Sequence, residues 1–400
     1  MISSIRTSYE KWPLESWVPM LLAATVFAVP LSSSLKSILM PLALFSIVIT
    51  PSYRRDLSAT LYRPWCQAAL LLFFMALIAC MWSPATFNEK ILVIGKYSKL
   101  LYLPILVVGF REPIARRLGT FAFLASMGII CVLSMMKAIG LLHFSGADPD
   151  MVFRNHIMLG HMMAFAAYLS ALFLMRYCGW PRLFYTTLFT LFSYQLFFIN
   201  SGRTGYVIYL MLMGLLAVQV LPWRKAVIAG LLGGVVVALS YVNSHVMHQR
   251  VDEAWSNWRH YQQNKDTPIG QRMQFHEFAK NLYQHHPWLG NGTASFTYSF
   301  RVQKPVASWE ETLLEPHSQY WLVASEFGSL GVLLLLFFFG SLLWASFRLE
   351  SMRPIAIALM LPFMLGNLSD SLLFYSGSGY FFLLLMALCL GEEKTKPESL

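Results

Sequence analysis

Apolar runs of about 20 residues recur along almost the whole 400-residue chain, and they constrain its fold more than any other feature. Hydrophobic residues make up 56% of the sequence, whereas charged residues make up only 12%. A soluble core cannot bury so much apolar surface, but a helix of roughly 20 apolar residues crosses a bilayer. The sequence therefore predicts an all-α membrane protein that crosses the membrane many times.

The apolar runs predict about twelve transmembrane helices. They lie at residues 17–30, 35–50, 65–82, 91–110, 118–142, 158–175, 183–199, 206–221, 226–242, 321–346, 354–368 and 379–390. One long polar stretch separates the first nine from the last three. We therefore expect nine spans within residues 1–243, a large and mostly helical insert at 244–320, three spans within residues 321–390, and a tail at 391–400.

The connections between the predicted spans differ in their content of lysine and arginine. Because cationic side chains are retained on the cytoplasmic side of a membrane, the basic connections mark that side. The basic set contains Arg6, Lys11, Arg54, Arg55, Arg63, Arg111, Arg116, Arg117, Arg176, Arg182, Arg224, Lys225, Arg348, Arg353, Lys394 and Lys396. The opposite set contains only Lys36, Lys90, Arg154 and Arg203 outside the insert. Both termini and the tail are therefore expected in the cytoplasm, and the insert on the outer face.

The net charge of +10 is largely this topological signal. A nucleic-acid-binding protein would gather its positive charge on one soluble face. We therefore expect membrane lipids as partners, and no nucleic acid.

The polar insert holds the residues best suited to chemistry. Its segment 271–283 carries an apolar stripe at helical spacing, which predicts a helix with Arg272 at its start, where backbone N–H groups also favour an anion. A second helix is expected to begin near Pro316 and to continue into the next span, which places His317 at the membrane interface. The adjacent His285 and His286 project apart, and no His-Glu-x-x-His motif accompanies them, so no catalytic metal is predicted.

Three other groups are expected near the same surface. Arg203 lies in a short outward turn, where it either contributes to a site or only anchors a helix end by snorkelling. Lys96 and Lys99 are three residues apart within one apolar span, and ionisable groups at this depth usually face the protein interior or a wet cavity. Asp370 lies at the outer end of the eleventh span.

Two or more cations and one histidine at the outer boundary suit a substrate with a phosphate-rich head and a lipid tail. A polyprenyl diphosphate sugar fits this description, since its diphosphate is a competent leaving group. Arginine holds phosphate oxygens bidentately and keeps its charge. Histidine has an unperturbed pKa close to the working pH, so it can deprotonate an acceptor hydroxyl.

Three motifs resemble those of the O-antigen ligase and polymerase superfamily of bacterial envelope glycosyltransferases. They are Ser-Gly-Arg-Thr-Gly at 201–205, Gly-Gln-Arg at 270–272 followed by Pro-Trp-Leu-Gly-Asn-Gly at 287–292, and Pro-His-Ser-Gln-Tyr at 316–320 followed by Glu-Phe-Gly-Ser-Leu-Gly at 326–331. Their order and their placement on one face carry the resemblance. It covers roughly residues 199–370, while the first half is similar only in hydropathy.

The resemblance implies a GT-C-type membrane glycosyltransferase that takes glycan from undecaprenyl diphosphate without a metal, a cofactor or a nucleotide sugar. Carried over by position, Arg203 and Arg272 would bind the diphosphate, and His317 would orient or deprotonate the acceptor hydroxyl. Asp370, Lys96 and Lys99 are the further substrate-binding candidates.

The size of the insert and its tryptophans favour a ligase, which must dock a second amphiphile. Such an enzyme would transfer O-antigen polysaccharide from its lipid carrier to the lipid A-core oligosaccharide, with inversion, on the periplasmic face of the bacterial inner membrane. A polymerase of the same fold is the alternative, and Ser318 leaves the subfamily open because many relatives have Asn there. A transporter of lipid-linked glycans would instead predict paired halves with interrupted helices near the midplane, and the sequence has no visible repeat.

Overall fold

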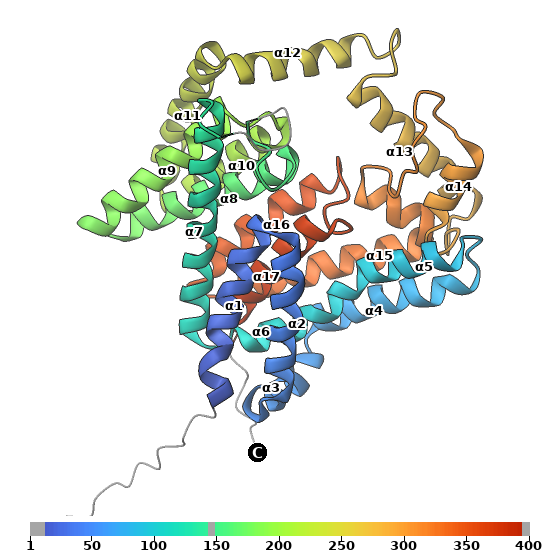
Figure 1. The fold of residues 1–400 in the computed structure, drawn as a ribbon, viewed down its shortest axis with the longest axis horizontal. Helices are drawn as coiled ribbons and strands as arrows, with labels where there is room; N and C mark the ends of the chain where they lie inside the picture. Colours follow the sequence, from blue (N-terminus) through green and yellow to red (C-terminus); the bar gives the residue numbers. More distant parts are fainter. Residues whose placement is uncertain (1–12, 143–148, 394–400) are drawn as a thin grey trace, which may run out of the picture.

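The computed structural model describes residues 13–142 and 149–393, and within these ranges every regular element is a helix (Figure 1). Four basic residues that mark the predicted cytoplasmic side lie outside the described residues, namely Arg6, Lys11, Lys394 and Lys396. So does most of the predicted tail.

Every predicted span falls on a helical segment. In chain order these segments are α1 (Pro13–Leu31), α2 (Ser33–Ile49), α4 (Pro64–Ile78), α5 (Phe87–Tyr97) with η2 (Ser98–Leu101) and α6 (Tyr102–Gly109), α7 (Pro113–Ala138), α8 (His156–Arg176), α9 (Trp180–Phe198), α10 (Arg203–Val220), α11 (Trp223–Asn243), α15 (Gln319–Phe347), α16 (Arg353–Gly366) and α17 (Ser376–Leu390). Two short helices, α3 (Pro51–Leu61) and η1 (Ala79–Met81), complete this set.

The count of twelve spans is not confirmed. Among the described residues, seven helical segments are long and apolar enough to cross a membrane, or eight if α2 and α3, bent by 93°, form one broken span. The helices α16 and α17 are apolar but have only 14 and 15 residues, fewer than the roughly 20 that a bilayer requires. The described helices are consistent with a polytopic membrane protein.

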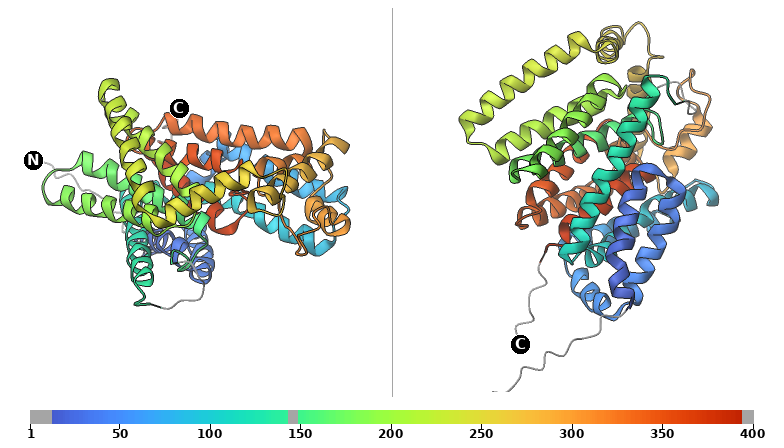
Figure 2. Two further views of the ribbon diagram at one scale, coloured as in Figure 1. Left: turned by 90° about the horizontal axis from the view of Figure 1, so that it is seen from above. Right: turned by 60° about the vertical axis from the view of Figure 1, so that its left-hand side comes forward.

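The helices pack around a core formed largely by α8 and α17. Both are buried along most of their length, because α8 packs between α9 and α10 and α17 lies against α6 and α16. In Figure 1, α1 runs alongside α7, and α4 runs alongside α15. The helix α11 lies at the periphery (Figure 2). It exposes apolar side chains such as Leu231 and Val242. Lipid tails would cover such a surface.

The polar stretch between α11 and α15 contains three helices. They are α12 (His245–Arg259), α13 (Pro268–His285) and α14 (Ser295–Gln303). Thr267 caps α13 by accepting a hydrogen bond from the N–H of Gly270, and Pro268 occupies the first turn. The predicted apolar stripe of α13 is confirmed, since Phe275 and Phe278 pack edge-on against aromatic rings of α14.

Two glycine-containing motifs far apart in the sequence dock on each other at a kink in α15. Gly328, inside α15, has φ +63° and ψ −160°, and Gly290, in the loop after α13, has φ +68°. A Cβ on Gly290 would lie 2.4 Å from the carbonyl carbon of Glu326, and one on Gly328 would lie 2.5 Å from that of Trp288. Only glycine fits at either position.

Backbone hydrogen bonds hold this junction together. The N–H groups of Asn291 and Gly292 donate to the carbonyls of Ser325 and Glu326, at 3.0 and 2.8 Å. In return, the N–H of Ser329 donates to the carbonyl of Pro287 at 2.7 Å. The loop thus fixes the end of α13 against α15.

Candidate functional site

His317 lies immediately before α15, in a backbone conformation that few non-glycine residues adopt. Its φ is +54°, which costs about 1–2 kcal/mol for an L-residue. Its N–H donates to Oε2 of Glu315 at 2.6 Å, and its carbonyl accepts from Nε2 of His276 at 3.1 Å. These two hydrogen bonds hold the strained residue in one orientation, as is common at functional sites.

Two carboxylates contact the same nitrogen of the His317 ring. Nδ1 lies 3.3 Å from Oε1 of Glu315 and 3.4 Å from Oδ1 of Asp370. The side chains of Glu315 and Asp370 are only 1% and 9% exposed, whereas that of His317 is 20% exposed. With Nδ1–H donating to a carboxylate, Nε2 carries the lone pair. Nε2 makes no hydrogen bond within the described part of the chain, so it is free to accept a proton.

Tyr375 and Phe275 contact Glu315 and the His317 ring and hold them in place. The hydroxyl of Tyr375 donates to Oε1 of Glu315 at 2.5 Å. Burial raises the pKa of Tyr375 well above its usual value, and the neighbouring carboxylate of Glu315 raises it further. Tyr375 therefore remains a hydrogen-bond donor. The ring of His317 stacks on that of Phe275, with 5.9 Å between the ring centroids. Burial lowers the pKa of His276, and this effect outweighs that of the hydrogen bond to the carbonyl of His317, which raises it.

Arg272, on the first turns of α13, lies next to this group. Its Nη1 donates to the carbonyl of Ser369 at 3.3 Å, and Ser369 directly precedes Asp370. The guanidinium is only partly buried. The structure therefore brings Arg272, His317 and Asp370 to one place, although they are separated by up to 98 positions in the chain.

Arg203 is the first residue of α10, and the turn before it is tightly built. Oδ1 of Asn200 accepts from the N–H of Gly202 at 2.7 Å. A Cβ on Gly202 would lie 2.7 Å from the carbonyl oxygen of His156, and one on Gly205 would lie 3.0 Å from Cα of Gly160. The small residues that flank Arg203 therefore allow α8 and α10 to approach closely at the site.

The guanidinium of Arg203 has no hydrogen-bond or ion-pair partner among the described residues. Its Nη1 is nevertheless buried, and its charge interacts with those of Glu253, Arg272 and Arg250. A buried donor without a partner is rare and costs about 1–3 kcal/mol. The Arg203 guanidinium is thus available to an anion beside Arg272.

The two predicted lysines occupy different environments. Lys96 lines a cavity of about 250 Å³ together with Asp370 and Tyr375. Lys99 is buried, and its Nζ donates to the carbonyls of Phe374 and Tyr375 at 2.9 and 3.0 Å. Lys99 therefore holds the backbone that carries Tyr375, whereas Lys96 faces the cavity.

Sequence reasoning missed four residues of this site, namely Glu315, His276, Tyr375 and Lys36. Glu315 stands two residues before His317, so its nearness could have been noticed. Lys36 is buried, with its Nζ 4.0 Å from the ring centroid of Tyr380, and its charge acts on Lys96 and Lys99. No local pattern brings Lys36 or Tyr375 to the site, since both depend on how distant helices pack.

Glu315, His317 and Asp370 also form a group that could hold a metal ion, because one ligand atom of each lies within 4.8 Å of the others. The sequence predicts no metal, and that remains a prediction. The hydrogen bonds already described give each group a partner without an ion.

The comparisons with known proteins concern the part of the chain that carries most of this site. The family model described as O-antigen ligase matches residues 186–336. This range includes Arg203, Arg272 and His317, but not Lys96, Lys99 or Asp370. No curated protein matches the chain. The match confirms the resemblance to the O-antigen ligase and polymerase superfamily.

Proposed function

From the membership of residues 186–336 in the O-antigen ligase and polymerase superfamily, we propose that this protein is an O-antigen ligase. It transfers O-antigen polysaccharide from undecaprenyl diphosphate to the lipid A-core oligosaccharide in lipopolysaccharide biosynthesis. One observation carries the proposal: His317, with Nδ1 held by two carboxylates, lies beside Arg272 and the unpaired Arg203.

The proposed reaction is a single displacement at the anomeric carbon of the donor. Nε2 of His317 takes the proton of the acceptor hydroxyl as the oxygen forms its bond to that carbon. The bond to the diphosphate oxygen breaks at the same time, and its electron pair stays on the diphosphate. Attack opposite the leaving group inverts the configuration. A well-placed general base contributes about 10²- to 10⁴-fold to such a step.

Arg203 and Arg272 bind the diphosphate and stabilise the charge that develops on it. Guanidinium groups suit this task because they keep their charge and bind phosphate oxygens in a bidentate manner. The carboxylates of Glu315 and Asp370 stabilise the imidazolium that forms on His317, as a carboxylate does in other histidine-based sites. The two guanidinium groups thus offset the charge that develops on the diphosphate, and the two carboxylates offset the charge on the imidazolium, so the proposed step uses no metal ion.

The lysines take supporting roles in this proposal. Lys96 faces the cavity it shares with Asp370, so it contributes positive charge next to the diphosphate. Lys99 acts as a positioning residue, because its ammonium group is occupied by two backbone carbonyls.

The proposed location is the bacterial inner membrane, with the site on the periplasmic face. The excess of lysine and arginine in one set of connections supports this orientation. Arg54 and Arg55 belong to α3, at the bottom of Figure 1, whereas α12 of the insert lies at the top. The insert at 244–320 would thus be periplasmic, and the tail at 391–400 cytoplasmic.

The test is a gel profile of lipopolysaccharide, together with the extracted carrier-linked glycans, from a strain that lacks the gene and from one that carries His317→Ala. A ligase predicts uncapped core and long glycan that accumulates on the carrier. Core capped by a single repeat unit would mean a polymerase of the same fold. An unchanged profile would refute the proposal.

A further inference from the structure

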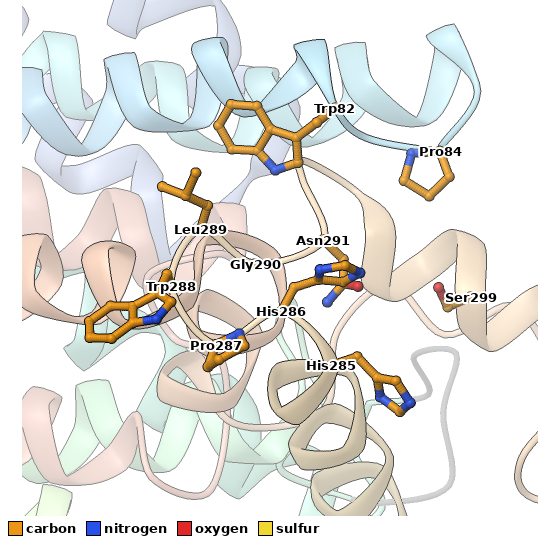
Figure 3. A pocket seen from close by; sticks show the side chains of 10 residues that line it. All are labelled: Trp82, Pro84, His285, His286, Pro287, Trp288, Leu289, Gly290, Asn291 and Ser299. Atoms are coloured by element: carbon orange, nitrogen blue, oxygen red, sulfur yellow. The ribbon is translucent and has the colours of Figure 1, made fainter.

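A second concave site lies beyond the residues assigned so far. A cleft of about 600 Å³ is formed where the loop after α13 meets the connection between α4 and α5 and one face of α14 (Figure 3). The aromatic and polar side chains of its lining are those of Trp82, His285, His286, Trp288, Asn291 and Ser299. This volume lies within the range of small-molecule binding sites.

The walls of the cleft are rigid although they are built from loops. Trp288 lies two residues before Gly290, and its carbonyl accepts a hydrogen bond from the N–H of Leu330 at 3.2 Å. On the other wall, Oγ of Ser83, next to Trp82, donates to the carbonyl of Thr293 at 2.5 Å. The backbone that carries the two indole rings is therefore held in place by hydrogen bonds, which lowers the entropic cost of binding a ligand there.

The polar lining offers hydrogen bonds of both kinds. The amide nitrogen of Asn291 donates to the carbonyls of Leu282 and Ser325, which leaves its Oδ1 as an acceptor. Nδ1 of His285 lies 2.8 Å from the carbonyl of Asn281, so its Nε2 is the free ring nitrogen. Ser299 and His286 add a hydroxyl and a second imidazole.

Indole rings combined with amide, hydroxyl and imidazole groups suit a saccharide. A sugar ring presents a face of C–H groups that can lie on an indole, and it presents hydroxyl groups at its edge for hydrogen bonds. Trp82 and Trp288 are 38% and 78% exposed, so they can receive such a ring. A fully apolar ligand would leave the polar groups of the lining without partners.

The cleft is separate from the reacting groups but connected to them by one helix. Arg272 lies near the start of α13, and His285 is its last residue. Thirteen residues at about 1.5 Å each place the cleft roughly 20 Å from Arg272 along the helix axis. This distance exceeds one sugar ring, so a ligand that reaches both places must be a glycan of several residues.

We propose that this cleft is a saccharide subsite, which binds sugar residues remote from the reacting anomeric carbon. The inference rests on the proposed function for the identity of the glycan. Two glycans share the required chemistry, the O-antigen polysaccharide of the donor and the core oligosaccharide of the acceptor, and the experiment separates them.

The experiment measures binding of free glycans to the full-length protein in nanodiscs. The two probes are an O-antigen oligosaccharide of several repeat units, cut from its carrier, and core oligosaccharide released from lipid A. We expect one of the two probes to bind the wild-type protein. Trp288→Ala and Trp82→Ala should each weaken that binding about tenfold, or about 1.4 kcal/mol, whereas Trp288→Phe should retain most of it.

Trp180→Ala is the matched control, because Trp180 is 83% exposed and lies at the start of α9, outside the cleft. Thermal unfolding of each variant checks that it is folded. Failure of both glycans to bind, or binding that Trp288→Ala and Trp82→Ala leave unchanged, would overturn the proposal.

A transfer assay keeps this inference distinct from the proposed function. The subsite predicts that Trp288→Ala raises KM for the glycan that binds, with kcat nearly unchanged. Normal transfer kinetics in Trp288→Ala would refute the subsite and leave the ligase proposal intact. Glycan binding that depends on Trp288, in a wild-type protein without transfer activity, would support the subsite and contradict the ligase proposal.

Discussion

At His317, two buried carboxylates share one imidazole nitrogen, and this geometry makes a specific kinetic prediction. Glu315→Gln or Asp370→Asn removes a negative charge that stabilises the imidazolium in the transition state. We expect each change to lower kcat by about 10- to 100-fold, with little change in KM. Steady-state transfer by the purified variants measures this effect.

The control is Glu277→Gln, which removes an exposed carboxylate from α13. If both Glu315→Gln and Asp370→Asn transferred glycan as fast as this control, the carboxylates would have only a structural role.

The same cluster allows a test of the metal-free prediction. Two guanidinium groups already supply positive charge to the diphosphate in the proposed mechanism, so transfer should survive dialysis against EDTA. Activity that disappears with the chelator and returns with a divalent cation would contradict this expectation. It would assign Glu315, His317 and Asp370 to a metal centre instead.

Six candidate residues could be singled out from the sequence: Lys96 and Lys99 lie within an apolar span, Asp370 lies at the end of one, and the other three are charged or titratable groups in unusual settings. Arg203 stands between small residues in a short turn, Arg272 opens an amphipathic helix, and His317 precedes an apolar run. The nearness of Glu315 to His317 could have been noticed because only one residue separates them, whereas Tyr375 could not be predicted, since a phenol near a helix end is common. Their role depends on the packing of α17 against α15 and on the backbone conformation at His317.

At the scale of helices, each predicted span coincides with a helical segment, and seven or eight of the described segments are long and apolar enough to cross a bilayer fully. A run such as 354–368 contains enough apolar residues, but α16 ends at Gly366 and is followed by turns that carry Asp370. The motifs at 287–292 and 326–331 stand out in the sequence only by their resemblance to the superfamily, and 326–331 lies inside the predicted span 321–346. Their docking on each other could not be predicted, because hydropathy carries no information about which loops meet.

This docking predicts opposite effects for two glycines of α15. In Gly328→Ala, a Cβ would lie 2.5 Å from the carbonyl of Trp288, at φ +63°. We expect a loss of about 1–3 kcal/mol of stability, a lower Tm and weaker transfer. Gly340→Ala is the matched control, since nothing lies within 4 Å of its Cβ. There the change should be neutral or slightly stabilising, because alanine favours the helix.

Thermal unfolding in detergent compares the two variants directly. Equal stability of Gly328→Ala and Gly340→Ala would mean that the kink does not depend on glycine at position 328.

For the whole molecule, the distribution of basic residues predicts which connections between the spans lie in the cytoplasm. Cys178 is exposed and lies in a predicted cytoplasmic connection, whereas Glu277 is exposed on α13 in the insert. A membrane-impermeant maleimide applied to intact spheroplasts should label Glu277→Cys in a Cys178→Ser background. It should label native Cys178 only after the membrane is disrupted. The reverse pattern would invert the proposed topology.

The most direct test of the central claim is transfer by the purified protein in nanodiscs, with carrier-linked O-antigen as donor and lipid A-core as acceptor. The proposed mechanism predicts transfer by the wild-type protein and a loss of at least about 10²-fold in Arg272→Ala and in His317→Ala. Lys280→Ala, which removes an exposed cation from the same helix as Arg272, should remain active. Near-normal transfer by Arg272→Ala or His317→Ala would contradict the role assigned to that residue, and absence of transfer by the folded wild-type protein would contradict the ligase proposal itself.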